Sequence, residues 1–485
     1  MRIGHSVASS TTRDLDADDE AIMERLRIGE ERRSVLSFLA QEMERIWSGF
    51  DRARDKEPEI TNELRSMLQE SLPRVPSEIT QALEDSVDVL DASIAQSRPR
   101  FLAYIGSSGL EVGAIGDFLA SSYDINQAVD SRAATMLEQQ TARWVGEFIG
   151  YPNAIGYFTS GGMVSNLTAL ATARSLVLPQ SRRSGIDRKV AIYASIESHY
   201  SVSRAVEVLG IGTDALRLIE IDDHRRMRVD LLAEKIREDL TAGVTPIAIV
   251  ATAGTTLTGA IDPIREIAKI AKAHRIWLHV DGAYGVPAAG TYQAPLFSGI
   301  EEADSITIDA HKWLFVPKSC SVVLMKNREN LAKTFSHEEA YMPHFEDNYN
   351  PVDLTLEYSR PLRALKLWIA FRTHGADAFK RAIEKNIELA KMTYEIASKR
   401  DDFRTLPFSP DLSIVPIQFQ DPRHPDSSAL NDRLCQAILD DGRFFISTAQ
   451  IDGETWLRPC YTNFRTTEQD VTALFEVIEE LSHTL

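Results

Sequence analysis

The sequence is poor in cysteine and in long hydrophobic runs, and each shortage excludes a class of protein. Three cysteines, Cys320, Cys435 and Cys460, are spread among 485 residues without a CxxC pair. So few thiols build neither a disulfide framework nor a thiolate metal site, so we expect no metal and a reducing compartment. The longest apolar run, around residues 247–253, is the size of a strand and far short of the ~18 residues of a membrane span.

Positive charge is also in short supply. Lysine and arginine number 53 against 71 aspartates and glutamates, which gives a formal net charge of −18. Such a surface repels phosphate backbones and anionic lipids, so we expect neither a nucleic-acid partner nor a membrane partner. The first twenty residues lack the apolar core of a signal peptide, and their aspartates argue against a transit peptide. These features predict a cytoplasmic protein.

Between about residues 110 and 330, short apolar runs alternate with helical patterns. The expected strands are residues 155–159, 190–195, 216–221, 247–252, 276–281, 305–309 and 320–325. Apolar strands separated by crossover helices predict an α/β fold with a mostly parallel seven-stranded sheet covered on both faces. Ligands of such sheets bind at the carboxyl ends of the strands, so the residues that follow each strand are the candidates for a functional site.

The chain on either side of this sheet predicts two further units. Residues 1–108 contain helical patterns broken by prolines, with too little apolar surface to fold alone, so they pack on the rest of the chain or on a second copy. Residues 109–372 form the large domain around the sheet. Residues 373–485, with a long helix, strand-like runs and a final helix, predict a small C-terminal α/β domain. Its expected strands are residues 412–419, 444–448 and 455–460.

Two charged residues stand at the ends of buried strands. Asp281 closes the strand 276–281, and Lys312 follows the strand 305–309 between a histidine and a tryptophan. A buried carboxylate is costly unless it is paired, and its partner here is either a cationic ring nitrogen or the start of a helix. Desolvation lowers the pKa of a lysine, which suits an amine that forms an imine.

Small, hydroxylated or aromatic residues follow three other strands. The segment 160–163, Ser-Gly-Gly-Met, leads into a helix and fits either a phosphate cradle or a turn that needs glycine. His199 and Thr256 follow two further strands, where each is either functional or structural. Combined with Asp281 and Lys312, these residues meet the needs of a pyridoxal 5'-phosphate site. Such a site requires a lysine for the imine, a carboxylate for the pyridine nitrogen, an anion cradle and a flat group against the ring.

At these residues the sequence resembles the group II pyridoxal-phosphate decarboxylases, the family of aromatic-amino-acid, histidine and glutamate decarboxylases. The resemblance covers nearly the whole chain, and its most specific motifs are WLHVDGAYG and HKW. The segments RPRFLAY, SGGMVSNL, ATAGTT and LRPCYTNFRTTEQD support it. The resemblance implies a fold-type-I homodimer with active sites at the subunit interface, and it explains the N-terminal helices as a dimerisation segment.

The resemblance also implies roles for the matching positions. Lys312 would form the imine, Asp281 would pair with the pyridine nitrogen and His199 would stack on the ring. The other residues expected to hold the cofactor are Gly161, Gly162, Met163, Thr256, Ala283 and His311. The residues expected to line the substrate pocket are Tyr104, Ile105, Ser107 and Asn126.

Tyr341 stands at a position that separates activities within the family. Decarboxylases of the aromatic group carry there, on a mobile loop, a tyrosine that protonates the carbanion left by loss of CO2. Related aldehyde synthases have phenylalanine at that place, or asparagine in place of the ring-stacking histidine. Tyr341 and His199 therefore favour simple decarboxylation, the alternative being a loop tyrosine that packs at the dimer interface.

The expected reaction is α-decarboxylation of an L-amino acid, first of all an aromatic one of the tryptophan, tyrosine, phenylalanine or DOPA type. Three positions depart from the animal aromatic decarboxylases, with Asp309 for asparagine, Gly106 for proline and Asn126 for an aromatic residue. Asp309 would repel the cofactor phosphate unless it points away or is neutralised. Gly106 and Asn126 leave open an acidic substrate (glutamate, aspartate or cysteine sulfinate), for which Arg98 or Arg100 could supply the cation. The sequence also leaves open a decarboxylation-dependent aldehyde synthase, a carbon–carbon lyase and a non-catalytic scaffold.

Overall fold

The computed structural model describes residues 26–54, 56, 58–337 and 350–485. The chain divides into two compact units, one of Met1–Phe50 with Pro58–Ile94 and one of Asp51–Glu57 with Ala95–Leu485. Each unit is described below by itself.

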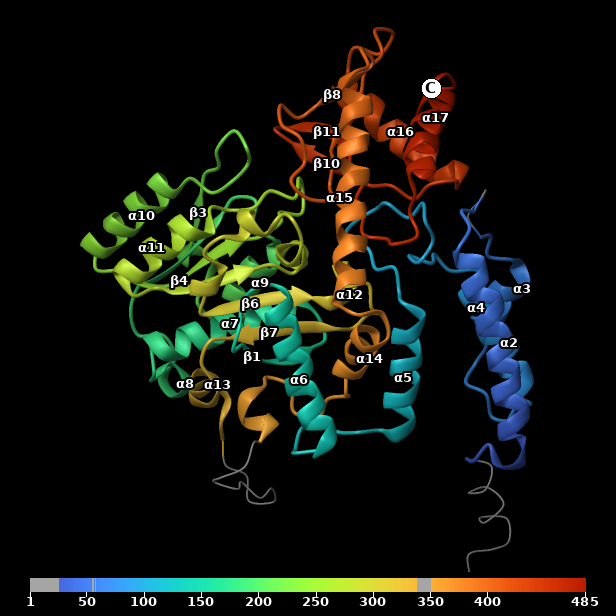
Figure 1. Ribbon diagram of the computed structural model, residues 1–485, viewed down its shortest axis with the longest axis horizontal. Coiled ribbons are helices and arrows are strands. Elements are labelled where there is room, and N and C mark those ends of the chain that lie inside the picture. The colour runs from blue at the N-terminus through green and yellow to red at the C-terminus, as the bar shows by residue number, and fades with distance from the viewer. Residues whose placement is uncertain (1–25, 55, 57, 338–349) are drawn as a thin grey trace, which may run out of the picture. The chain divides into compact units, whose positions relative to one another are not determined.

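The first unit is helical. Its elements are η1 (Gly29–Glu31), α2 (Arg32–Phe50), α3 (Asn62–Met67) and α4 (Ile79–Asp91) (Figure 1). Arg45 joins α2 to α4 because its Nη2 lies 2.7 Å from Oδ2 of Asp91. Among the described residues of this unit only Val35 is buried, whereas Leu68, Leu72 and Val75 are mostly exposed. The unit therefore has almost no hydrophobic core of its own.

The second unit is built around a seven-stranded sheet in the order β1-β7-β6-β5-β4-β2-β3. The strands are β1 (Ile155–Thr159), β2 (Val190–Ser195), β3 (Leu216–Ile219), β4 (Thr245–Thr252), β5 (Trp277–Asp281), β6 (Ser305–Asp309) and β7 (Ser321–Met325). Strands β2 to β6 run parallel, and β7 runs antiparallel to both of its neighbours. The predicted α/β fold with a mostly parallel sheet is confirmed, and every predicted strand of the sheet is present with small differences at the ends.

Both faces of this sheet are buried because alternate strand residues point to opposite sides. On β2, Ile192 and Ala194 pack in one hydrophobic cluster, and Ala191 and Tyr193 pack in another. The first cluster includes residues of α7 (Gly162–Val177), α9 (Tyr200–Val208) and α13 (Arg328–Phe335). The second cluster includes residues of α6 (Ala133–Phe148), α10 (Val229–Thr241) and α11 (Ile264–His274) (Figure 1). The other helix of this part is α5 (Glu111–Tyr123). The short elements are α8 (Ser181–Ser184), η2 (Thr213–Ala215), η3 (Val286–Gly290), η4 (Ala294–Phe297), η5 (Ile300–Glu302), α12 (Ala310–Trp313) and η6 (Pro351–Leu354).

The C-terminal part of this unit carries a second sheet. Its helices are α14 (Ala364–His374), α15 (Ala376–Ser398), α16 (Ser427–Asp441) and α17 (Glu468–Ser482). Its strands β8 (Phe403–Thr405), β9 (Ile417–Phe419), β10 (Thr448–Ile451) and β11 (Glu454–Leu457) pair antiparallel in the order β10-β11-β9-β8. Three of them are shorter or shifted relative to the predicted runs, because Leu412, Ile414, Phe444 and Ile446 are buried outside any strand.

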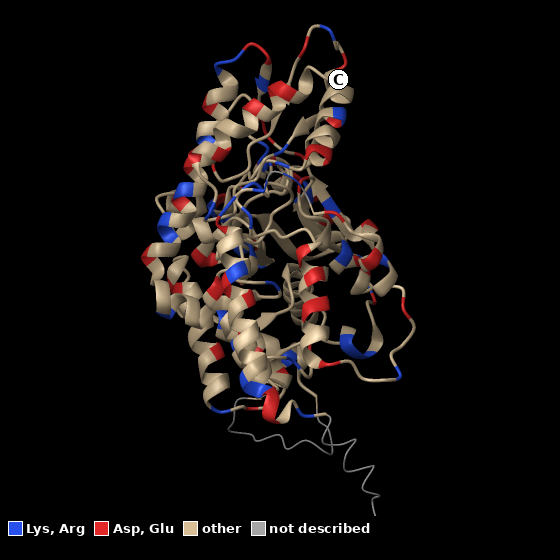
Figure 2. Ribbon diagram, turned by 90° about the vertical axis from the view of Figure 1, so that its right-hand side faces the viewer, with Lys and Arg blue, Asp and Glu red and all other residues tan. Residues whose placement is uncertain are grey.

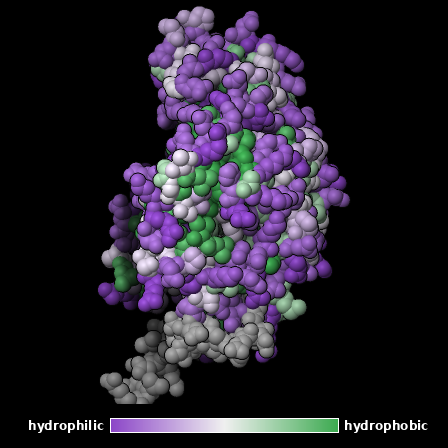
Figure 3. Space-filling view, turned by 90° about the vertical axis from the view of Figure 1, so that its left-hand side faces the viewer, coloured by the Kyte–Doolittle hydropathy of each residue, from purple (hydrophilic) through white to green (hydrophobic). Residues whose placement is uncertain are grey.

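Charged groups of both signs are mixed on the surface. Figure 2 shows lysine and arginine interspersed with aspartate and glutamate along the helices, so in this view the acidic excess is spread over many elements. Figure 3 shows a largely hydrophilic face with a strip of hydrophobic side chains at its centre. Within the described ranges, no helix combines the length and the apolar composition that a membrane crossing requires.

Candidate active site

A pocket in the second unit lies where the carboxyl ends of the central strands meet. It is lined by Ile105, Gly162, Met163, Asn166, His199, Ser201, Thr252, Gly254, Thr256, Asp281, Ala283, Tyr284, Asp309 and Lys312. The carboxyl edge of a mostly parallel sheet is where ligands of this architecture bind. The fold therefore brings residues from distant strand ends into one place.

The turn between β1 and α7 forms one wall of this pocket. The first amides of a helix lack intrahelical acceptors and lie at its positive end. A Cβ atom on Gly162 would lie 2.9 Å from Oδ2 of Asp309 and 3.3 Å from Cβ of Ala283, so a larger residue does not fit without a shift. A Cβ atom on Gly161 would meet nothing within 4 Å. The turn thus presents backbone N–H groups beside open space, an arrangement that fits the phosphate of pyridoxal phosphate.

Lys312 enters the pocket from α12, directly after β6. Its Nζ lies 3.1 Å from Oδ2 of Asp309, and Nε2 of His311 lies 3.8 Å from the same oxygen. Burial raises the pKa of Asp309, but the charges of Lys312 and His311 outweigh burial and the pKa is lowered. The carboxylate that was expected to repel a phosphate is therefore ionised, and its charge is neutralised by the lysine.

Asp281 ends β5 with both oxygens engaged. Its Oδ1 accepts from the N–H of Ala283 at 3.2 Å, and its Oδ2 accepts from the side-chain amide of Asn166 at 2.9 Å. Both carboxylate oxygens are thus fixed by donors, and a carboxylate held in place is the partner that a protonated pyridine nitrogen requires. The buried polar lining of the pocket also includes Thr252, whose hydroxyl has no hydrogen-bond partner among the described residues. These residues fit pyridoxal phosphate.

His199 caps α9 at its N-terminus. Its Nδ1 accepts a hydrogen bond from the backbone N–H of Ser201 at 3.2 Å. Burial lowers the pKa of His199 more than the nearby charge of Asp281 raises it. The imidazole is therefore neutral at physiological pH, and a neutral ring lies flat on another ring without bringing a second charge into the site.

The four predicted substrate residues take different places. Ile105 lines the pocket. Tyr104 is 60% exposed, and Ser107 is buried with its hydroxyl donating to the carbonyl of Val316 at 3.1 Å. Asn126 is exposed, and its Oδ1 accepts from the N–H of Ala128 at 2.9 Å. Within the described chain, only Ile105 of the four lines this pocket.

Three predicted residues remain to be placed. Gly161 and His311 adjoin the pocket through their neighbours Gly162 and Lys312 without lining it. Tyr341 belongs to residues 338–349, which lie outside the described residues, so its role stays a prediction.

Arg458 is a residue that the sequence reasoning missed. Its Nε donates to the carbonyl of Thr256 at 2.7 Å and its Nη1 to the carbonyl of Tyr104 at 2.9 Å. Its Nη2 is buried and has no hydrogen-bond partner among the described residues. The motif LRPCYTNF contains this arginine, but nothing in the motif shows that it hydrogen-bonds Thr256, a residue that lines the pocket. Arg100, expected as a local cation, is instead paired with Oδ1 of Asp470 at 2.9 Å.

Comparisons with known proteins agree with this geometry. The pyridoxal-dependent decarboxylase conserved domain matches residues 61–420. An aromatic-L-amino-acid decarboxylase of Bacillus atrophaeus is 33% identical over 431 residues, which cover 86% of this chain and 88% of that protein. An L-2,4-diaminobutyrate decarboxylase of Rhizobium meliloti (strain 1021) is 31% identical, covering 85% and 84%. The crystal structure of mouse CSAD shares the fold with a TM-score of 0.85 at 24% identity, covering 93% of this chain and 99% of that one.

Proposed function

Because this chain belongs to the pyridoxal-dependent decarboxylase family and is an amino-acid decarboxylase that uses pyridoxal 5'-phosphate, we propose that its substrate is an aromatic L-amino acid. The products are then the corresponding amine and CO2. The similarity to the aromatic-L-amino-acid decarboxylase of Bacillus atrophaeus is the observation that carries the substrate class. When bound, the cofactor supplies the electron sink for the electron pair left by the departing CO2.

In this proposal each residue of the pocket has a separate task. Lys312 would hold the cofactor through an imine at its Nζ. Asp281, held by its two donors, would pair with the ring nitrogen, and neutral His199 would lie against the ring. Ala283 and Thr256, which line the same pocket, would contact the ring. Gly161, Gly162, Met163 and His311 hold the phosphate.

Arg458 is our candidate for the group that holds the substrate carboxylate. A buried guanidinium nitrogen without a partner is costly, and a carboxylate is its natural partner. The carbonyls of Thr256 and Tyr104 fix the rest of the side chain, so Nη2 is held in one direction. Tyr104, Ile105, Ser107 and Asn126 remain our candidates for contacts with the substrate side chain. Tyr341 is our candidate for the proton donor to Cα.

We also propose that the protein works as a homodimer. Helix α5 carries Ile115, Phe118 and Leu119 on one exposed face, at the spacing that places residues side by side on a helix. The first unit likewise leaves large apolar side chains exposed. Two such surfaces in one chain are more than a soluble monomer normally leaves in water, and a second copy supplies the matching surface.

A CO2-release screen tests the proposed substrate class. The purified holoenzyme is offered L-tryptophan, L-tyrosine, L-phenylalanine, L-DOPA, L-glutamate, L-aspartate, cysteine sulfinate and L-2,4-diaminobutyrate, with Lys312→Ala as the inactive control. We expect CO2 and an equal amount of amine from at least one aromatic substrate. Preferred release from an acidic or diamino substrate would overturn the aromatic class. Aldehyde and hydrogen peroxide in place of the amine would show an aldehyde synthase.

A further inference from the structure

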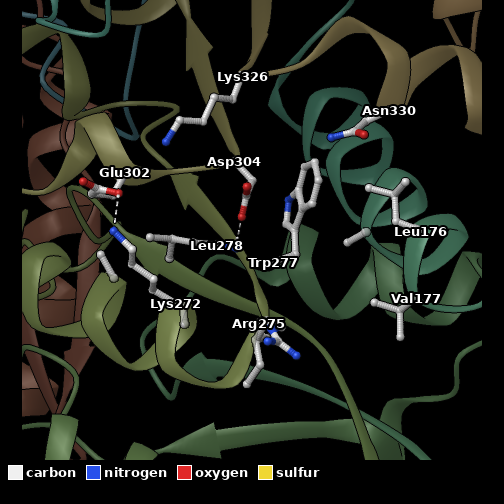
Figure 4. Close-up of a pocket in the computed structure, with 14 residues that line it drawn as sticks. Leu176, Val177, Lys272, Arg275, Trp277, Leu278, Glu302, Asp304, Lys326 and Asn330 are labelled. Atoms are coloured by element: carbon white, nitrogen blue, oxygen red, sulfur yellow. Dashed lines mark hydrogen bonds and ion pairs between the residues drawn. The ribbon is translucent and has the colours of Figure 1, made fainter.

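Strand β5 carries a row of polar side chains along one face. Trp277, His279 and Asp281 alternate with Leu278 and Val280, so the three point to the same side of the sheet. At the amino end, Trp277 lines a cavity of about 510 Å³, and Figure 4 shows its indole beside Asp304. At the carboxyl end, Asp281 lines the active-site pocket. A row of hydrogen-bonding groups inside a buried sheet must be satisfied internally, which fixes its geometry.

The orientation of the Asn166 amide decides which atom donates in each hydrogen bond of this row. Its Nδ2 lies 2.9 Å from Oδ2 of Asp281 and 2.9 Å from Oγ of Ser201. An ionised carboxylate only accepts hydrogen bonds, so the amide nitrogen must face Asp281. The amide oxygen of Asn166 therefore faces Nε2 of His279, at 3.0 Å, and that nitrogen carries the proton.

The hydrogen bonds at the amino end of β5 agree with this assignment. With its proton on Nε2, the neutral ring of His279 accepts at Nδ1, which lies 2.8 Å from Oγ of Ser305. The indole N–H of Trp277 donates to the same Oγ at 2.8 Å, so the hydroxyl proton is free to point at His279. Burial lowers the pKa of His279 to about 4, so the ring is neutral at physiological pH. Each group from Trp277 to Asn166 thus has one consistent orientation.

The same reasoning continues to His199. Oγ of Ser201 accepts from Asn166, so its proton is available to Nδ1 of His199 at 2.8 Å. The backbone N–H of Ser201, which only donates, also points at this Nδ1 at 3.2 Å. Two donors on one nitrogen leave it without a proton of its own. The proton of the neutral imidazole therefore sits on Nε2.

We propose that Ser201, oriented by Asn166 and His279, is a positioning residue that fixes His199 as the Nε2–H tautomer. This inference rests on the proposed function only for the place of His199 in the catalytic site. Its consequence is that His199 offers the pocket a hydrogen-bond donor, and it cannot take a proton at Nε2 while the ring is held in this way.

The tautomer is measured directly on the full-length protein without cofactor. The sample carries ¹⁵N-labelled histidine, and the His199 signals are assigned by comparison with His199→Asn. We expect Nδ1 to resonate as an unprotonated nitrogen and Nε2 as a protonated one. The reverse pattern, or an even mixture of the two tautomers, would overturn the inference.

Ser201→Ala tests the positioning role, with Ser203→Ala on the same helix as the matched control. A donor to the unprotonated Nδ1 stabilises the neutral ring, so its loss raises the pKa of His199. The expected rise is about 1, the worth of one hydrogen bond. Ser203→Ala should leave this pKa unchanged, and Ser201→Thr, which keeps the hydroxyl, should restore it. The charged groups that act on His199 are Asp281, Asp309 and Lys312, and all three are retained in every variant.

An unchanged His199 pKa in Ser201→Ala, or the same rise in Ser203→Ala, would overturn the positioning role. Both measurements are made without cofactor or substrate. If they succeed and no amino acid is decarboxylated, the proposed function fails while the assignment of the tautomer stands.

Discussion

At the scale of single residues, the charged groups in and around the pocket differ in whether a partner within the chain pairs with them. The charges of Asp281, Asp309 and Lys312 are engaged within the chain. Arg458 is the cation whose Nη2 is buried without a hydrogen-bond partner among the described residues. A cation in that state beside the pocket favours an anionic ligand, which a substrate carboxylate provides.

We predict that Arg458→Gln raises KM for the amino acid by about tenfold to a hundredfold, the worth of a hydrogen bond to a charged group. The amine product lacks the carboxylate, so its inhibition constant should stay within about twofold of the wild-type value. Initial-rate kinetics with the amine as inhibitor gives both constants for one protein sample. An unchanged KM, or a parallel loss of affinity for the amine, would contradict the assignment of Arg458 to the carboxylate.

At the scale of elements, the turn from β1 into α7 combines tight packing with open space. Gly162 is pressed against the carboxylate of Asp309, and that carboxylate is held by Lys312. A side chain at Gly162 would therefore displace the charged pair and narrow the space in front of the helix.

We predict that Gly162→Ala weakens binding of pyridoxal phosphate to the apoprotein by about tenfold or more, in the range of overpacking effects. The dissociation constant is measured by titration of the apoprotein, and the thermal unfolding temperature is recorded in parallel to separate local from global damage. Wild-type affinity in a folded Gly162→Ala protein would show that the turn does not form the phosphate cradle.

The elements that the sequence predicted well are the ones with a strong local pattern. The strands of the large sheet are short apolar runs between helices, and burial on both faces demands that composition. Strand β8 was missed because its three residues are too few to show the alternation of apolar and polar residues that marks a strand. In the pocket, Asp281 ends β5 and Lys312 stands three residues after β6, so the strand pattern alone predicts their places. Arg458 was missed because it contacts Thr256 at the pocket only through the packing of distant parts of the chain.

At the scale of the whole molecule, exposed apolar surface is the feature that needs an explanation. Ile115, Phe118 and Leu119 lie together on α5, while Gly116 on the same helix packs closely on Lys366 and Ile369 of α14. One face of α5 thus packs on its own chain, and the other is exposed. The proposed dimer would bury these side chains away from water.

We predict that Phe118→Arg converts the protein from a dimer to a monomer at micromolar concentration and removes most of its activity. An arginine in the centre of an apolar interface costs the burial of an unpaired charge. Val208→Arg, which replaces an exposed apolar residue on α9, is the control and should stay dimeric. Sedimentation velocity distinguishes the two species. A wild-type monomer, or a dimer that survives Phe118→Arg, would contradict this account of the surface.

The central claim is that Lys312 carries the cofactor in the pocket at the carboxyl edge of the sheet. Borohydride reduction of the holoenzyme makes the linkage between a lysine and pyridoxal phosphate permanent, and peptide mapping by mass spectrometry then identifies the lysine. We predict that the phosphopyridoxyl group is found on the peptide that contains Lys312, with about one group per chain, and that Lys312→Ala abolishes the label. A label on another lysine, or a wild-type protein that takes up no label, would contradict the claim.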